Sequence, residues 1–318
     1  MSKIPVIAVV GPTASGKTSL AVEIAKRYNG EIISADSMQI YKGMPIATAQ
    51  PTVKEMENIP HHLIAFADIN EKFSVADYVT LAKEKIESIY KDGKTPIIAG
   101  GTGLYINALF NLSFDESKSD DNLRAKLESE FEQNGGQAML NRLNLIDKET
   151  ADKLHPSDKK RIIRALEIYE LSGKTKTEID KLAQNTESPY SVCYIGINYK
   201  DREKLYARIN MRVDEMINMG LIDEAKKYAD INPSFTSAQA IGYKELSPHF
   251  KGEDSLDNCI DNLKKETRHY AKRQLTWFRR DKNIKWFYPD TYLDNDELIS
   301  EVTDYINRFM KGETANEI

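Results

Sequence analysis

The chain has 318 residues, 41% of them hydrophobic, which is enough for a large core and a second, smaller domain. A formal net charge of −5 argues against a protein that holds nucleic acid by bulk positive charge, so any nucleic-acid site must be a local patch. The two cysteines, Cys193 and Cys259, exclude a disulfide framework and a zinc-ligand cluster, and we expect two buried thiols.

The first apolar run predicts a buried strand at Val6 to Val10. The run is too short for a membrane span and does not resemble a signal peptide, so we expect a cytoplasmic protein without membrane contact. It leads into GPTASGKT at residues 11–18, which matches GxxxxGK[ST], and then into an amphipathic helix with Leu20 and Ile24 on one side. The order is strand, glycine loop, helix.

This unit predicts a phosphate site. Glycine lets the backbone turn its N–H groups inward, the helix N-terminus adds partial positive charge, and Lys17 adds a full one. The pattern arises by chance in a chain of this length with a probability on the order of a percent. Thr18 is the expected hydroxyl ligand of a Mg²⁺ ion. The residues expected to bind a diphosphate are Gly11, Pro12, Thr13, Ala14, Ser15, Gly16, Lys17 and Thr18.

Two further strands are predicted at Glu31 to Asp36 and Thr95 to Ala99, with an amphipathic helix between them. Alternating strands and helices imply a parallel sheet with helices on both faces. Asp36 then ends the second strand beside the glycine loop, where it could act as a base or a metal ligand. The third strand runs into Gly100-Gly101-Thr102-Gly103 and has no Walker-B-like aspartate, which weakens an ATPase interpretation. This turn suits phosphate contact or helix packing about equally.

The segment from residue 114 to 190 contains no convincing strand, is interrupted at Gly135-Gly136, and is interpreted as several helices. Strands are predicted again at Val192 to Asn198 and Ile284 to Tyr288. We therefore predict an α/β fold with a P-loop NTPase-like parallel sheet, formed by residues 1–113 and 191–318, and an inserted all-helical domain at 114–190.

Positive charge is concentrated near the C-terminus. Residues 264–285 carry nine Lys or Arg and two acidic residues, a net charge of +7 against −12 for the rest of the chain. Arg268, Lys272 and Arg273 with Tyr270 suit RNA backbone contacts and base stacking, whereas Trp277 and Phe278 taken alone are more typical of core packing. Smaller clusters occur at residues 159–164 and at Lys204, Arg208 and Arg212. Three basic clusters and one phosphate loop favour a large polyanion as ligand.

As an ordered set, the motifs resemble those of the tRNA dimethylallyltransferase (isopentenyltransferase) family over roughly nine-tenths of the chain. They are GPTASGKTSLA (11–21), SADSMQIYKGMPIATAQP (34–51), PHHL (60–63), GGTGLY (100–105), RIIRALEIY (161–169), RINMRVDEMINMGLIDE (208–224), AIGYKEL (240–246) and TRHYAKRQLTWFRR (267–280). The resemblance implies transfer of a dimethylallyl group from dimethylallyl diphosphate to N6 of the adenosine immediately 3′ of the anticodon. The target base must leave its stack to react.

The resemblance also implies residue roles. Lys17, the loop amides, Arg208 and Thr18 with Mg²⁺ would stabilise the leaving diphosphate, Asp36 would take the amine proton, and Thr102 joins them as a catalytic residue. The chain is expected to be a monomer that binds the anticodon stem-loop. The expected tRNA contacts are Asp36, Ser37, Met38, Gln39, Thr102, Arg124, Lys160, Arg161, Ile162, Ile163, Arg164, Lys272 and Arg273.

The sequence departs from the family pattern in two respects. Ala47 and Gln50 stand where the family commonly has glycine and lysine, which removes a cationic contact at Gln50. The C-terminal zinc finger of eukaryotic members is absent, so the resemblance is to the bacterial type.

Two other functions remain open. A small-molecule P-loop kinase or a free-adenylate prenyltransferase would share the loop but would not need a helical insertion or a +7 segment. A non-catalytic RNA-binding P-loop protein would leave Asp36 without a role.

Overall fold

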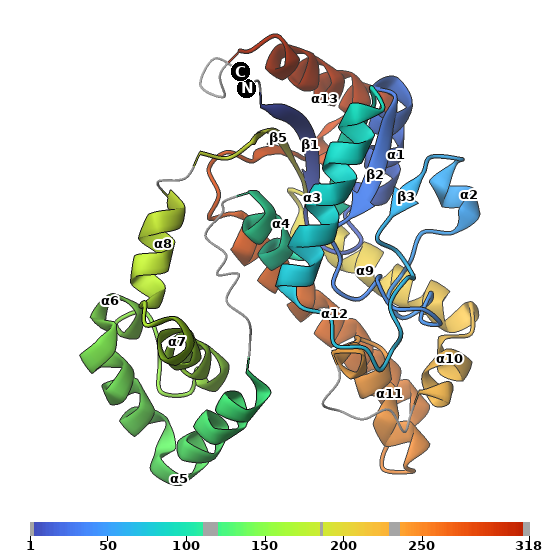
Figure 1. The fold of residues 1–318 in the computed structure, drawn as a ribbon. Coiled ribbons are helices and arrows are strands. Elements are labelled where there is room, and N and C mark those ends of the chain that lie inside the picture. Colours follow the sequence, from blue (N-terminus) through green and yellow to red (C-terminus); the bar gives the residue numbers. More distant parts are fainter. Residues whose placement is uncertain (1–2, 111–119, 185–186, 229–235, 314–318) are drawn as a thin grey trace. The chain divides into compact units, whose positions relative to one another are not determined.

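The computed structural model describes residues 3–110, 120–184, 187–228 and 236–313. Its centre is a six-stranded, wholly parallel sheet with the order β3-β2-β4-β1-β5-β6 (Figure 1). The strands are β1 (Ile4–Val10), β2 (Gly30–Ser34), β3 (His61–His62), β4 (Thr95–Gly100), β5 (Tyr190–Ile197) and β6 (Lys285–Phe287). The predicted α/β fold class is confirmed. The edge strand β3 was not predicted, because a pair of histidines carries no apolar pattern.

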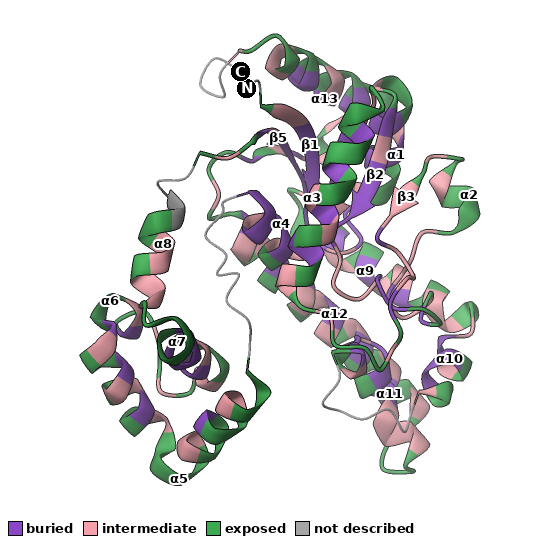
Figure 2. Cartoon of the chain, in the orientation of Figure 1, coloured by how far each residue is buried: buried purple, intermediate pink, exposed green. Residues whose placement is uncertain are grey.

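Helices cover both faces of the sheet because its central strands are apolar on both sides. On one face, Ile7 and Val9 of β1 pack in a buried cluster with α1 (Lys17–Arg27) and α13 (Asn295–Met310). On the other, α3 (Val75–Lys91) lies against β1, β2 and β4 with Tyr78, Val79, Ala82, Ile86 and Ile89 buried. Figure 2 shows the buried residues gathered in the strands and on the sheet-facing sides of these helices.

The remaining helices of the sheet-containing part are α2 (Val53–Met56), α4 (Gly103–Phe110), α9 (Arg202–Asn218), α10 (Leu221–Lys227), α11 (Tyr243–Phe250) and α12 (Leu256–Phe278), with 3-10 turns at Ser237–Gln239 and Pro289–Thr291. Helix α12 packs against α9 and α11. In a parallel sheet all strand carboxyl ends meet at one edge, so the loops that follow β1, β2 and β4 are brought together there. The candidate site lies at that edge.

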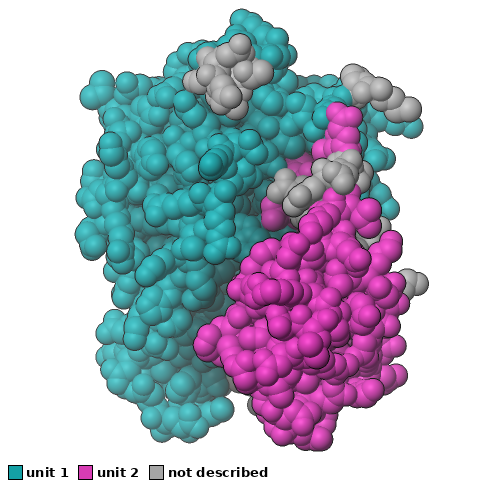
Figure 3. All heavy atoms as spheres, turned by 90° about the vertical axis from the view of Figure 1, so that its left-hand side faces the viewer, with its two compact units in different colours: residues 1–106, 189–318 teal, residues 107–188 magenta. Residues whose placement is uncertain are grey.

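The chain divides into two compact units, residues 1–106 with 189–318 and residues 107–188 (Figure 3). The described part of the second unit is helical and contains α5 (Asp121–Ile146), α6 (Lys148–Ala151), α7 (Lys159–Ser172) and α8 (Lys176–Gln184). It has its own core, which includes Leu127, Leu143 and Leu166. Gly135, with a φ of 78°, interrupts α5 at the predicted break. The predicted boundary at residue 114 lies outside the described residues.

Two smaller expectations concern the cysteines and the membrane. Cys193 and Cys259 are both buried free thiols, as predicted. Within the described ranges, none of the helices has the length and apolar character needed to cross a membrane.

Candidate active site

The glycine loop connects β1 to α1 in a conformation that requires its glycines. Gly11, Ala14 and Gly16 have φ angles of 151°, 60° and 98°. A Cβ on Gly11 would lie 2.2 Å from the carbonyl oxygen of Ile197 in β5, so no larger residue fits there. Helix α1 has no side-chain cap at Gly16, so its first backbone N–H groups remain available to an anion.

Two side chains of this loop suit an anionic ligand. The hydroxyl of Ser15 is buried and has no hydrogen-bond partner among the described residues. Lys17 Nζ donates to the carbonyl oxygen of Pro12 at 2.6 Å. Burial and, to a lesser extent, the charge of Arg212 lower the pKa of Lys17 to about 7, although the carboxylate of Asp36 opposes the decrease. A diphosphate would give the hydroxyl an acceptor and restore the charge of the lysine.

Asp36 lies two residues beyond the end of β2, which stops at Ser34, so the predicted strand end at Asp36 was wrong. Its Oδ1 accepts hydrogen bonds from the backbone N–H groups of Met38 (2.9 Å) and Gln39 (3.3 Å). Its Oδ2 makes no hydrogen bond to a described residue. The backbone N–H of Ser37 donates to Thr102 Oγ1 at 3.0 Å, so Thr102 holds the same turn.

One cavity of about 320 Å³ joins the glycine loop to the Asp36 turn. Its polar lining includes Thr13, Lys17 and Thr18 of the loop, Asp36, Ser37 and Gln39 of the turn, and the cations Arg212 of α9 and Arg273 of α12. Its apolar lining includes Ile209, Val213, Met216 and Ile241. A cationic end beside an apolar wall fits a ligand that combines a phosphate group with a short hydrocarbon.

The same cavity offers oxygen ligands to a magnesium ion. Thr18 and Asp36 both line it and offer a hydroxyl and a carboxylate, which are oxygen ligands that Mg²⁺ prefers. No group of three His, Cys, Asp or Glu residues suited to hold a metal occurs in the described ranges. The residues therefore fit an ion that takes its other ligands from water and a bound diphosphate, as Mg²⁺ commonly does.

Helix α9 brings two of its three aligned cations to the site. Its buried Leu205 and Ile209 pack with Ala14 of the loop. Arg208 Nε donates to the carbonyl oxygen of Ala14 at 3.1 Å, and Arg212 lines the cavity. Lys204 is exposed. Arg208 and Thr102 are not among the cavity-lining residues, but Arg208 contacts the phosphate loop at Ala14 and Thr102 contacts the Asp36 turn at Ser37.

Gln274 of α12 was missed in the sequence. Its side chain is buried; Oε1 accepts from the backbone N–H of Thr13 at 2.8 Å and Nε2 donates to the carbonyl oxygen of Gly101 at 3.0 Å. A Cβ on Gly101 would lie 2.1 Å from Nε2, and one on Gly103 would lie 2.1 Å from Trp277 Cδ1. The glycines after β4 therefore accommodate α12, which favours the packing interpretation of that turn.

A buried glutamate, also missed, holds the cavity wall. Glu224 of α10 accepts from the backbone N–H groups of Ile46 (3.0 Å) and Ala47 (2.8 Å) and from the Tyr243 hydroxyl (3.1 Å). Gln50, at the family's lysine position, donates to the carbonyl oxygens of Gln39 (3.0 Å) and Tyr41 (2.8 Å). Gln50 thus stabilises the backbone of residues 39–41 by two hydrogen bonds.

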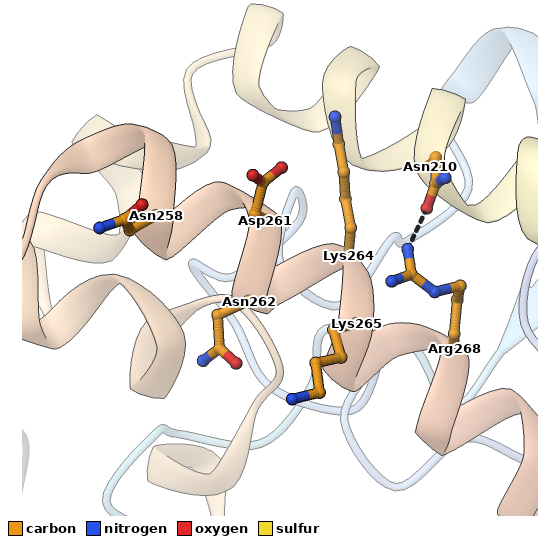
Figure 4. Close-up of a pocket in the computed structure, with 7 residues that line it drawn as sticks. All are labelled: Asn210, Asn258, Asp261, Asn262, Lys264, Lys265 and Arg268. Carbon is orange, nitrogen blue, oxygen red and sulfur yellow. Dashed lines mark hydrogen bonds between the residues drawn. The ribbon is translucent and has the colours of Figure 1, made fainter.

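The outer surface of α12 carries the predicted cations. Lys272 and Arg273 are exposed, and Arg273 also lines the cavity and lies 5.8 Å from the centre of the Tyr270 ring. Phe278 is buried and Trp277 half-buried, which confirms that they pack inward. Further toward the start of α12, Figure 4 shows a polar surface pocket in which Arg268 donates to Asn210 of α9 at 2.6 Å. Its lining is Asn210, Asn258, Asp261, Asn262, Lys264, Lys265 and Arg268.

In the helical unit, the predicted tRNA contacts separate into exposed and buried residues. Lys160 and Arg161 are exposed. Ile162 and Ile163 are 0% and 3% exposed and belong to the unit's core, so contact of this segment with tRNA through their side chains is not expected, and contact through its backbone stays a prediction. In a helix the inward-facing positions recur every three or four residues, so a continuous run of residues cannot all face the same side.

Arg124 and Arg164 are held by a shared carboxylate. Each donates to Glu167 Oε2, at 2.8 Å and 2.9 Å, and Glu167 is fully buried. Burial alone would raise the pKa of Glu167, but the two arginines hold it below its usual range. The pair is thereby fixed in orientation on one side of the unit.

Comparison with known proteins places the chain among enzymes of one type. The family model for IPP transferase matches residues 39–281. The chain is 47% identical over 307 residues to the tRNA dimethylallyltransferase of Thermoanaerobacter pseudethanolicus, covering 95% of this chain and 98% of the relative. It is 48% identical over 304 residues to that of Halalkalibacterium halodurans, covering 94% of this chain and 96% of the relative.

Two solved structures are similar over nearly the whole chain. The full-length tRNA isopentenylpyrophosphate transferase of Bacillus halodurans has a TM-score of 0.73 and 44% identity, with 98% of each chain covered. A eukaryotic dimethylallyltransferase acting on tRNA has a TM-score of 0.83 and 30% identity, with 98% of this chain and 80% of that chain covered.

Proposed function

The chain belongs to the IPP transferase family and is an enzyme, and we propose that it transfers the dimethylallyl group of dimethylallyl diphosphate to N6 of the adenosine 3′-adjacent to the anticodon of tRNA. The observation that carries the proposal is the cavity in which a phosphate loop, a carboxylate and an apolar wall meet. Relatives named tRNA dimethylallyltransferase, at 46–48% identity, support it over its alternatives.

The glycine loop is suited to the donor's diphosphate. The diphosphate would be bound by the uncapped backbone N–H groups at the start of α1, by the Ser15 hydroxyl and by Lys17. The hydrocarbon would contact Ile209, Val213 and Met216. As the C1–O bond breaks, negative charge grows on the diphosphate, and Lys17 with Arg212 and Arg208 would stabilise it. A bound Mg²⁺, held in part by Thr18, would supply further charge neutralisation.

Asp36 is suited to the acceptor. Oδ1 is occupied by the turn, whereas Oδ2 has no partner among the described residues and can accept a proton. The N6 lone pair forms the bond to C1 while C1–O breaks, and the N6 proton passes to Asp36. The products are N6-(dimethylallyl)adenosine in tRNA and diphosphate, so atoms and charge balance.

The proposed tRNA surfaces are the exposed cations of each unit. Lys272 and Arg273 of α12 flank the cavity, and the helical unit contributes Lys160, Arg161 and the Arg124–Arg164 pair. Cations of this kind bind RNA phosphates, while the target adenine leaves the anticodon loop to enter the cavity. We further propose that one chain carries out the reaction as a monomer.

The alternatives fit the site less well. A kinase or ATPase would need an acidic group after β4, where Gly101 instead contacts Gln274. A non-catalytic RNA-binding protein would have no use for a carboxylate and a phosphate loop in one cavity.

The test is incubation of purified protein and Mg²⁺ with labelled dimethylallyl diphosphate and unmodified tRNA, without ATP. Label is expected on N6 of the adenosine next to the anticodon, and a tRNA with guanosine at that position should remain unlabelled. Label in free AMP but not in tRNA would indicate the adenylate prenyltransferase. A strict requirement for ATP, with phosphate released in step with product, would contradict the proposal.

A further inference from the structure

One end of the phosphate loop is closed by a side chain from the distant helix α12. Gln274 is 6% exposed, and its carboxamide bridges the backbone N–H of Thr13 and the carbonyl oxygen of Gly101. A Cβ on Gly101 would lie 2.1 Å from Gln274 Nε2 and 3.5 Å from the carbonyl oxygen of Gly11. The carboxamide therefore fills the space between the loop after β1 and the turn after β4.

This position matters for the length of the phosphate chain that the loop can hold. P-loops that bind nucleoside triphosphates use the loop backbone and its lysine to cradle a terminal phosphate. Here the Thr13 amide already donates to Gln274, although Thr13, Lys17 and Thr18 all line the cavity. The donors that remain are those nearer the start of α1, together with Lys17.

The hydrogen bond from Gln274 to Gly101 also affects how a third phosphate could be bound. The turn after β4 is where a P-loop hydrolase would offer an acidic residue to its metal or attacking water, and Gly101 has no side chain to offer. Its carbonyl oxygen is also occupied by Gln274. One carboxamide thus covers both places at which a third phosphate and its metal would be handled.

We propose that Gln274 is a specificity-determining residue that closes the phosphate loop at Thr13 and limits its ligand to a diphosphate. The proposal rests on the proposed function, because it takes the loop to be the donor's diphosphate site. Both ends of the carboxamide are hydrogen-bonded to backbone groups, so its orientation is fixed. A fixed, buried side chain excludes a ligand better than a mobile one, since no alternative conformer opens the space.

The test compares the affinities of the full-length protein for inorganic pyrophosphate and tripolyphosphate, by calorimetry with Mg²⁺ present. Wild type is expected to prefer pyrophosphate. Gln274→Ala frees the Thr13 amide and the space beside it, and should raise the ratio of tripolyphosphate to pyrophosphate affinity about tenfold, the equivalent of one hydrogen bond to a charged group. Gln274→Met keeps the volume and should leave the ratio near that of wild type.

The thermal unfolding midpoint of each variant is measured to check that the variant is folded. Gln274→Ser, a second small residue that opens the same space and is polar, is measured in parallel in case the alanine variant does not fold. A folded alanine or serine variant with the wild-type ratio would overturn the inference while leaving the proposed function intact. Wild-type protein that binds tripolyphosphate more tightly than pyrophosphate would overturn the inference and would also count against the proposed function.

Discussion

At the scale of single residues, the two oxygens of Asp36 have different environments. Oδ1 is committed to the backbone of Met38 and Gln39, and Oδ2 makes no hydrogen bond within the described ranges. Asparagine can keep the first arrangement, because its amide oxygen also accepts from backbone N–H groups. It cannot take a proton from an amine.

Asp36→Asn is therefore expected to lower kcat by ~10²- to 10⁴-fold, the usual contribution of a positioned base. The KM for tRNA and the affinity for pyrophosphate should change little. The measurement is steady-state prenylation over a range of Mg²⁺ concentrations. A raised Mg²⁺ requirement would identify Asp36 as a metal ligand instead, and a near wild-type kcat would restrict it to shaping the turn.

Lys17 makes donor binding depend on pH. Burial lowers the pKa of its ammonium group to about 7 in the absence of ligand. A bound diphosphate raises that pKa, so above pH 7 the complex takes up a proton that the free protein lacks. The affinity for the donor should consequently fall as pH rises above this value, by up to about tenfold per pH unit. Below it, this group contributes no pH dependence.

The proton can be counted by calorimetry with pyrophosphate at alkaline pH in buffers that differ in ionisation enthalpy. Wild type should take up close to one proton more than Lys17→Arg, because arginine stays charged throughout. Protonation of pyrophosphate itself is common to both proteins and cancels in the difference. Equal uptake by the two would mean that Lys17 is already charged before the ligand binds.

At the scale of elements, α12 has two functions on its two sides. Its buried side supplies Gln274 to the phosphate loop, and its exposed side carries Lys272 and Arg273. Replacing both cations with alanine should raise the KM for tRNA and flatten the dependence of binding on salt, because fewer phosphate contacts release fewer counterions. Pyrophosphate affinity should remain close to that of wild type.

The matched control is the double variant Lys85→Ala with Lys91→Ala. Both lysines are exposed on α3, the helix that covers one face of the sheet. Both double variants lose the same net charge. If the two shift tRNA binding equally, the effect is one of overall charge, and α12 is not an RNA-contacting helix.

The elements also show what sequence patterns can and cannot reveal. β1, the glycine loop and α1 were predictable because their signals lie within about two dozen consecutive residues. Gln274 was not, since its partner Thr13 is 261 positions away and a lone glutamine carries no pattern. The spacing of Arg212 on α9 is typical of a row of solvent-exposed cations. Its side chain lines the cavity because α9 packs against the phosphate loop, which the spacing does not reveal. The sequence therefore predicts the chemistry of local motifs, whereas it does not predict contacts between distant elements.

At the scale of the whole molecule, the two units have separate cores and should respond differently to acid. Hydrogen bonds from Arg124 and Arg164 hold the pKa of Glu167 low despite its burial. A carboxyl whose pKa is lower in the folded than in the unfolded state stabilises the fold above its unfolded pKa, and that contribution is lost as pH falls through the folded pKa.

Glu167→Gln should accordingly lower the free energy of unfolding of the helical unit at neutral pH, and the difference from wild type should shrink under acidic conditions. Thermal unfolding of both proteins at neutral and acidic pH measures this. Arg142→Gln, which alters a partly exposed ion pair with Glu130 in the same unit, serves as the control and should have a smaller effect. A difference that persists unchanged in acid would exclude an ionised Glu167.

The insertion of the helical unit also determines the order in which parts of the sheet are synthesised. β1 pairs with β4 on one side and with β5 on the other, and β5 is synthesised only after the helical unit. At translation rates of roughly 5–20 residues per second, the ~260 residues between Gly11 and Gln274 take on the order of ten seconds to a minute to appear. Throughout that interval the nascent loop lacks the carboxamide at Thr13, and for the earlier part of it the loop also lacks Ile197 beside Gly11. The phosphate loop is therefore synthesised well before Ile197 and Gln274, the two residues that complete its surroundings.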